Sequence, residues 1–241
     1  MANAARRRPP WALLLAAATG LAVVAARRVR RRQQARDDRR PADVGFMRAI
    51  HAGLRRDMAR LEAVAPELER RGAAAVPKGW AGFRRTLQVH HDAEDDDLWP
   101  VLRGHLTDDE DAHQLDVMVE EHRELTAAID AVEAALGRGA GVTVAVDRLG
   151  EVLRGHLDHE EQRIFPLLER HLSRREWRRF LDTERRRRPP RERPEFLAWV
   201  LDDATDEDAA AVMAELPRPA HVVYRRILRP RYAAQRRWQP A

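Results

Sequence analysis

The sequence predicts an all-α protein built on an antiparallel four-helix bundle, for three reasons. The 241 residues are 34% charged and only 5% aromatic, a composition that favours long helices over a β-sandwich. Apolar residues recur every three or four positions through several long segments, which is the period of an amphipathic helix. The pattern of one helical hairpin also occurs twice, and two such hairpins bury their apolar stripes best against each other.

Residues 41–172 are expected to form this bundle. The stripe of the first helix ends near Gly72 and comprises Met47, His51, Leu54, Met58 and Leu61. A second helix is expected to open at Pro77, with a stripe of Phe83, Leu87, His90, Glu94 and Leu98. Pro100 should then kink or end it, because proline lacks the backbone N–H that a helix interior needs.

The third and fourth helices follow after short connections. Thr107 and Glu110 form a capping-box pattern that should open the third helix, whose stripe is Leu115, Met118, His122, Leu125, Ile129, Val132 and Leu136. Gly137, Gly139 and Gly141 are expected to end it. The stripe of the fourth helix is Leu149, Leu153, His156, Glu160 and Ile164, and Pro166 follows it.

The two hairpins are copies of one pattern. When the stripe of the second helix is aligned with that of the fourth, His90 falls on His156 and Glu94 on Glu160. Alignment of the first stripe with the third places His51 on His122 in the same way. The halves therefore predict a two-fold repeated arrangement around a shared interior.

Six polar residues stand where the helical period demands apolar side chains: His51, His90, Glu94, His122, His156 and Glu160. An unpaired buried carboxylate costs several kcal/mol, and the inward stripes contain no Lys or Arg that could offset it. His and Glu four residues apart present their donor atoms in one direction. The set therefore predicts a metal centre, with enough donors for two ions bridged by carboxylates.

The absence of cysteine excludes disulfides, iron–sulfur clusters and thiolate zinc sites. Imidazole and carboxylate ligands without sulfur favour iron over manganese or zinc. We therefore expect two non-haem iron ions as the cofactor.

The order His51, His90-x-x-x-Glu94, His122, His156-x-x-x-Glu160, with D-D-L-W-P and R-I-F-P trailing the two pairs, resembles the hemerythrin-like (HHE cation-binding) domain over about residues 41–171. The resemblance implies a four-helix bundle around a di-iron centre. It also implies that the four histidines are terminal ligands and that Glu94 and Glu160 bridge the irons.

The sequence departs from the oxygen-carrying hemerythrins that it resembles. Their third helix brings two histidines one turn apart, whereas Met118 and Thr126 stand four residues before and after His122. Their last carboxylate is an Asp five residues beyond its histidine, whereas Glu160 lies four beyond His156. A fifth histidine ligand is therefore missing from the expected place, which weakens the case for reversible oxygen carriage.

Two functions follow as expectations. The first is a di-iron protein that binds or senses a small ligand (oxygen, nitric oxide or peroxide) or iron itself. The alternative is a di-iron enzyme that reduces peroxide or nitric oxide, or oxidises Fe(II). A metal-free helical interaction protein is disfavoured by the buried polar set. No phosphate loop or nucleophile motif points to an organic substrate, and we assign no catalytic residue.

The remaining histidines and acids receive structural interpretations. His91 is expected to point away from the His90 face, and the others are expected to be solvated or to cap helix ends: His105, His113, His171 and His221. Asp95 to Asp97 and Glu161 are expected to form a solvated face. His159, three residues from His156, is a possible neighbour of the centre.

Residues 1–40 are basic, with 11 Arg against 2 Asp, and include an uncharged run from Pro9 to Ala26. As a helix this run would be about 27 Å long, close to the minimum for crossing a bilayer. The flanking arginines predict a single-pass membrane anchor with the bundle on the cytoplasmic side. A cleaved export signal, a loosely anchored helix, a misassigned start site or a cytoplasmic protein are the alternatives.

Charge is distributed unevenly along the chain. Residues 41–170 contain 26 acidic and 16 basic side chains, so we expect no nucleic-acid partner although the sequence pI is about 10.6. Residues 173–241 are expected to form a basic linker, centred on residues 184–194, and a helical extension with short helices over 195–201 and 209–216. No sequence signal sets an oligomeric state.

Overall fold

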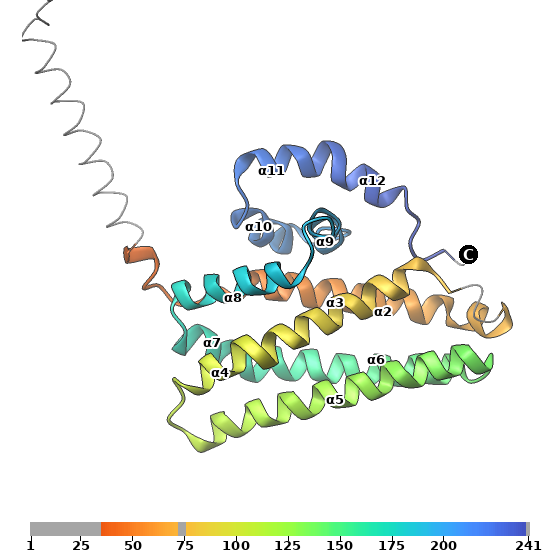
Figure 1. Cartoon of the computed structure of the whole chain (residues 1–241), viewed down its shortest axis with the longest axis horizontal. Coiled ribbons are helices and arrows are strands. Elements are labelled where there is room, and N and C mark those ends of the chain that lie inside the picture. The colour runs from red at the N-terminus through yellow and green to blue at the C-terminus, as the bar shows by residue number, and fades with distance from the viewer. Residues whose placement is uncertain (1–34, 72–75, 240–241) are drawn as a thin grey trace, which may run out of the picture.

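The computed structural model describes residues 35–71 and 76–239, and within these ranges it is helical with no β-strand. Its main body is a bundle whose four long helices are α2 (Gly45–Arg71), α3 (Lys78–Ala93), α5 (Asp109–Arg138) and α6 (Val142–His159). Short connections make chain neighbours antiparallel (Figure 1). The predicted all-α four-helix bundle is confirmed.

The sequence signals at the helix ends act mostly as predicted. The residue that opens α5 is Asp108 rather than the predicted Thr107, because the Asp108 carboxylate accepts hydrogen bonds from the backbone N–H groups of Glu110 and Asp111. Gly139 ends α5 with a φ of 68°, and Gly141 precedes α6 with a φ of 75°. Both glycines adopt the left-handed region, where a side chain would be strained.

Neither proline ends its helix. Helix α3 continues through a π-helical turn, η2 (Glu94–Leu98), into α4 (Trp99–Arg103), and α6 continues through η3 (Glu160–Ile164) into α7 (Phe165–His171). The wider π turn accommodates the ring and the missing N–H of the proline that follows it. As a result, the repeated glutamates Glu94 and Glu160 each begin a π turn.

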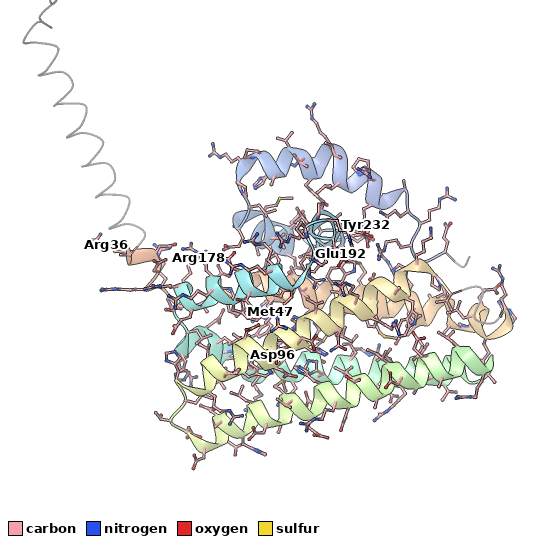
Figure 2. All side chains as sticks on the ribbon, in the orientation of Figure 1. Arg36, Met47, Asp96, Arg178, Glu192 and Tyr232 are labelled. Carbon is pink, nitrogen blue, oxygen red and sulfur yellow. The ribbon has the colours of Figure 1, made fainter. Side chains whose placement is uncertain are left out.

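The core of the bundle consists of two apolar clusters. One surrounds Met47, Leu98, Met118 and Phe165 near the α4–α5 connection. The other, larger cluster contains residues from farther along the four helices and from the C-terminal extension, among them Leu54, Leu87, Leu125, Leu153 and Trp199. Figure 2 shows side chains filling the space between the bundle helices, with Met47 in the interior. The six predicted site residues belong to neither cluster.

The C-terminal third lies over one side of the bundle, formed by α2 and α3 (Figure 1). It consists of α8 (Arg174–Arg187), α9 (Arg193–Val200), α10 (Asp206–Ala214), α11 (Arg218–Val223), η4 (Tyr224–Leu228) and α12 (Arg229–Ala233). Part of the expected basic linker is the end of α8, and Arg187 there donates hydrogen bonds to Asp96 and Asp97. Near the start of α8, Arg178 contacts Asp37 and Asp38, and Figure 2 shows it beside the segment of Arg36.

The prediction of a single-pass membrane protein is contradicted. Across residues 35–71 and 76–239, no helix has both the length and the apolar character needed to cross a membrane. The long helices are amphipathic: an apolar face packs in the bundle and the opposite face carries charge. The apolar run over residues 9–26, on which the predicted anchor rested, lies outside the described residues.

Candidate metal centre

The six predicted site residues come together in one buried layer that crosses all four bundle helices. His51 comes from α2, His122 from α5, and the two His-x-x-x-Glu pairs from the junctions of α3 with η2 and of α6 with η3. His51, His90, Glu94 and Glu160 have no exposed surface, and His156 and His122 are 2% and 4% exposed. The helical period thus placed all six side chains inward.

The layer contains two groups of ligand-type side chains. In the first group, formed by His51, His90, Glu94 and Glu160, one ligand atom of each residue lies within 4.8 Å of all the others. The Nε2 atom of His51 is 3.1 Å from Glu160 Oε2, and the Nε2 atom of His90 is 3.2 Å from Glu94 Oε1. The two Nε2 atoms are 3.2 Å apart. This spacing suits donors that share one cation.

The second group consists of His91, His122 and His156, whose ring nitrogens meet the same 4.8 Å limit. The expectation that His91 points away from the centre is wrong. Its side chain is 6% exposed, and its ring is stacked on that of His122 with the centroids 4.0 Å apart. Helix α3 packs between neighbouring helices, so the buried part of its surface is wide enough to include both His90 and the next residue, His91.

The two carboxylates connect the groups. Glu94 approaches His90 with Oε1, and its Oε2 is 3.5 Å from the Nε2 atom of His122. Glu160 Oε2, which is close to His51, is 3.9 Å from the Nε2 atom of His156. Each glutamate therefore lies between imidazoles of both groups, as a carboxylate that bridges two cations would.

Several buried ligand atoms of the layer lack a hydrogen-bond partner. They are both carboxylate oxygens of Glu94 and of Glu160, and the Nε2 atoms of His91, His122 and His156. Burial raises the pKa of Glu94 well above its usual range, and the nearby charge of Glu160 raises it further. Buried polar atoms are rarely left unpaired, so these residues fit metal ions, which would bind the free lone pairs and offset the negative charge.

A second set of carboxylates holds the outer nitrogens of the imidazoles. The Nδ1 atom of His51 is 2.9 Å from Glu161, that of His122 is 2.9 Å from Asp95, and that of His156 is 3.0 Å from Glu121. A carboxylate that accepts the Nδ1 proton leaves Nε2 free to bind a metal. Asp95 and Glu161, which the sequence places on a solvated face, are half-buried and contact imidazoles, whereas Asp96 and Asp97 pair with Arg187.

The environment of Glu161 keeps this carboxylate charged. Burial raises the pKa of Glu161, but hydrogen bonds from His51 and from Arg55 outweigh that effect and lower it to about 2. The Arg55 guanidinium also contacts Asp158 at 2.6 Å, which fixes its position at the rim of the centre. His51 is thus held from outside the layer by a charged network.

Sequence reasoning missed Glu121. Its two oxygens accept from the Nδ1 atoms of His156 and His159, at 3.0 and 2.8 Å, and the Nε2 atom of His159 is 2.9 Å from Gln114 Oε1. The internal repeat contains a signal for Asp95 and Glu161, because these two acids occupy equivalent positions when His90 is aligned with His156. It contains no such signal for Glu121, because the equivalent residue in α2 is Ile50.

A helical bundle that encloses a buried layer of imidazoles and carboxylates is typical of metal-binding helical proteins, and the chain is of this class. Residues 42–168, more than half of the chain, match the family model described as the Hemerythrin HHE cation binding domain. The chain therefore belongs to the hemerythrin HHE family, and the predicted resemblance is confirmed. No curated protein and no solved structure matches the chain.

Proposed function

We propose that the centre holds two non-haem iron ions. His51 and His90 would bind one ion, His122 and His156 the other, and Glu94 and Glu160 would bridge them. The observation that carries this proposal is the set of buried, unpartnered donor atoms, which includes all four carboxylate oxygens. Nitrogen and oxygen donors without sulfur favour iron over the zinc of thiolate sites, and di-iron proteins can build their centres from inward-facing His and Glu side chains of a four-helix bundle.

The proposed role is to bind or sense a small ligand (oxygen, nitric oxide or peroxide), or iron itself. Iron would supply redox chemistry and a position for such a ligand. The chain would supply the rest: imidazoles oriented by Glu161, Asp95 and Glu121, and apolar clusters that exclude water from the layer. A site enclosed in this way favours small ligands over organic substrates.

Metal analysis tests the cofactor. Protein purified from cells supplied with iron, or reconstituted anaerobically with Fe(II), should contain close to two irons per chain. His90→Ala and Glu160→Ala should each lower that number, because each removes a donor from the buried layer. His105→Ala is the matched control, since His105 is exposed and contacts Glu176 away from the centre. Wild-type protein that takes up no iron under either condition would refute the proposal.

Ligand mixing separates binding from catalysis. Anaerobically reduced protein should be mixed with oxygen, nitric oxide and peroxide in turn while the absorption spectrum is recorded. A stable or reversible new charge-transfer band with one of these ligands supports binding or sensing. Rapid turnover of many equivalents of peroxide or nitric oxide would instead favour the alternative, a di-iron enzyme.

A further inference from the structure

We propose that His91 is a fifth imidazole ligand, which binds only the metal ion held by His122 and His156. This inference rests on the proposed two-metal function and adds to it that the two metal positions are chemically unequal. The fifth histidine that the third bundle helix does not provide would come instead from α3, from the residue next to His90.

The position of His91 supports a ligand role. Its ring lies parallel to that of His122, with the planes 9° apart, and its centroid is 5.1 Å from that of His156. Its Nε2 atom is buried and has no hydrogen-bond partner, like the Nε2 atoms of the other two. Three buried imidazoles whose nitrogens converge within 4.8 Å form a set that one cation can satisfy.

The internal duplication shows that the other metal position lacks an equivalent imidazole. The alignment of the two halves that places His90 on His156 also places His91 on Leu157. Leu157 is fully buried and belongs to the larger apolar cluster, together with Leu54 and Leu87. The two halves therefore match in the other four imidazoles and in the two glutamates, but only the first half has a histidine at this position.

At the position of α5 where a further histidine is expected by resemblance, the chain has an apolar core residue. Met118, one turn before His122, is fully buried in the apolar cluster around Phe165. With His91 as a ligand, three imidazoles would bind one ion and two would bind the other.

Unequal donor sets predict unequal affinities. The ion bound by three imidazoles should be held more tightly than the ion bound by two, since both share the same two glutamates. Removal of His91 should abolish this difference. Because substitutions of residues that only support a ligand weaken metal binding by about 10- to 100-fold, loss of a direct ligand should weaken the affected position by at least about 10-fold.

The test is iron retention by His91→Leu, anaerobically reconstituted and dialysed against a graded series of chelator concentrations. Leucine is the residue at the equivalent place in the other half, so it suits a buried helix position, and circular dichroism checks the fold. His91→Gln is a second variant of similar size that keeps a polar group. His113→Leu, at an exposed position on α5, is the matched control.

The expected result is that wild type loses its two irons at clearly different chelator concentrations. In His91→Leu and His91→Gln the more tightly held iron should be lost at about the same chelator concentration as the weaker one, so the separate second step should disappear. Their Mössbauer spectra should lack the signal of the iron environment that has three imidazoles. Two irons in both variants, with the retention curve and spectrum of wild type, would overturn the His91 assignment and leave the two-iron proposal standing. Wild type that takes up no iron would refute both.

Discussion

At the residue scale, the imidazoles that α2, α5 and α6 contribute to the layer are each held at the outer ring nitrogen. One ring nitrogen faces the interior of the layer, and the other contacts a carboxylate at its rim: Glu161 for His51, Asp95 for His122 and Glu121 for His156. Two of these contacts cross between the repeated halves, because Asp95 belongs to the first half and serves His122, while Glu161 belongs to the second half and serves His51. The pairing therefore ties the two hairpins together at the centre.

Glu121→Ala should weaken metal binding by about 10- to 100-fold, because Glu121 fixes the orientation and the Nδ1 proton of His156. The measurement is an anaerobic Fe(II) titration against a competing chelator. Glu120→Ala is a closely matched control, since Glu120 is exposed and pairs with Arg123 on the same helix. Equal iron affinity in the two variants would show that Glu121 does not position the ligand.

At the element scale, the π-helical turns are explained by proline. The three π segments in the described part of the chain are η2, η3 and η4, and each is followed by proline as the second residue of the next helix: Pro100, Pro166 and Pro230. The η4 segment belongs to the C-terminal extension and contains no histidine or carboxylate, so metal ligands are not required for the turn. In the bundle, the repeated proline sets the local backbone in which Glu94 and Glu160 begin a π turn.

Glu69 of α2 caps the start of α6, which Gly141 cannot do because it has no side chain. The Glu69 carboxylate accepts from the backbone N–H groups of Gly141 and Thr143, at 2.8 and 3.1 Å, and from the Thr143 hydroxyl at 2.7 Å. The hydrogen bond from the Thr143 side chain and those from the backbone lower the pKa of Glu69. This contact joins the first helix of one hairpin to the connection of the other.

Glu69→Gln should lower the free energy of unfolding at neutral pH. Because the pKa of Glu69 is lower in the folded state, its charge stabilises the fold above the pKa of an unfolded glutamate, about 4.3, and this contribution is lost as the pH falls through the folded value. The difference in the free energy of unfolding between wild type and Glu69→Gln should therefore become smaller as the pH is lowered. Urea unfolding at about pH 7 and about pH 3 measures it. Glu67→Gln is the matched control, since Glu67 pairs with nearby arginines of α2 itself, and an equal loss of stability in the two variants would contradict the capping role of Glu69.

At the scale of the whole molecule, one buried acid is among the contacts that join the C-terminal extension to the bundle. Asp57 of α2 is 1% exposed, and it accepts hydrogen bonds from the indole N–H groups of Trp199, at 2.7 Å, and Trp238, at 3.0 Å. Burial raises the pKa of Asp57, and the two indole hydrogen bonds oppose that effect only in part. Segments far apart in the chain thus meet at a single carboxylate.

Asp57→Ala should destabilise the protein by about 1–3 kcal/mol, because it leaves the buried indole N–H group of Trp199 and the partly buried one of Trp238 without their acceptor. Urea unfolding followed by tryptophan fluorescence measures this loss, and limited proteolysis should cut residues 174–239 faster. Asp182→Ala is the control, since the Asp182 side chain is 57% exposed and pairs with Arg185 on the same helix. Identical unfolding curves for wild type and Asp57→Ala would contradict the proposed role of Asp57.

The sequence by itself determined the bundle and the inward position of six polar side chains. Helical periodicity places a residue on a face without reference to the rest of the chain, so the stripes through His51 and His122, and the repeat of His90 and Glu94, were enough. The same period misplaced His91, because it does not reveal how wide an arc of α3 its neighbours cover.

Only the tertiary structure decided which residues surround the centre. Glu121 lies at the edge of its helix, where charged side chains are usual, and its contact with His156 depends on how α5 packs against α6. Asp95 and Glu161 likewise find their imidazoles on other helices, and Asp57 finds its tryptophans in the C-terminal extension. Such contacts join segments far apart in the chain, and their geometry is set by helix packing, which a local sequence pattern does not encode.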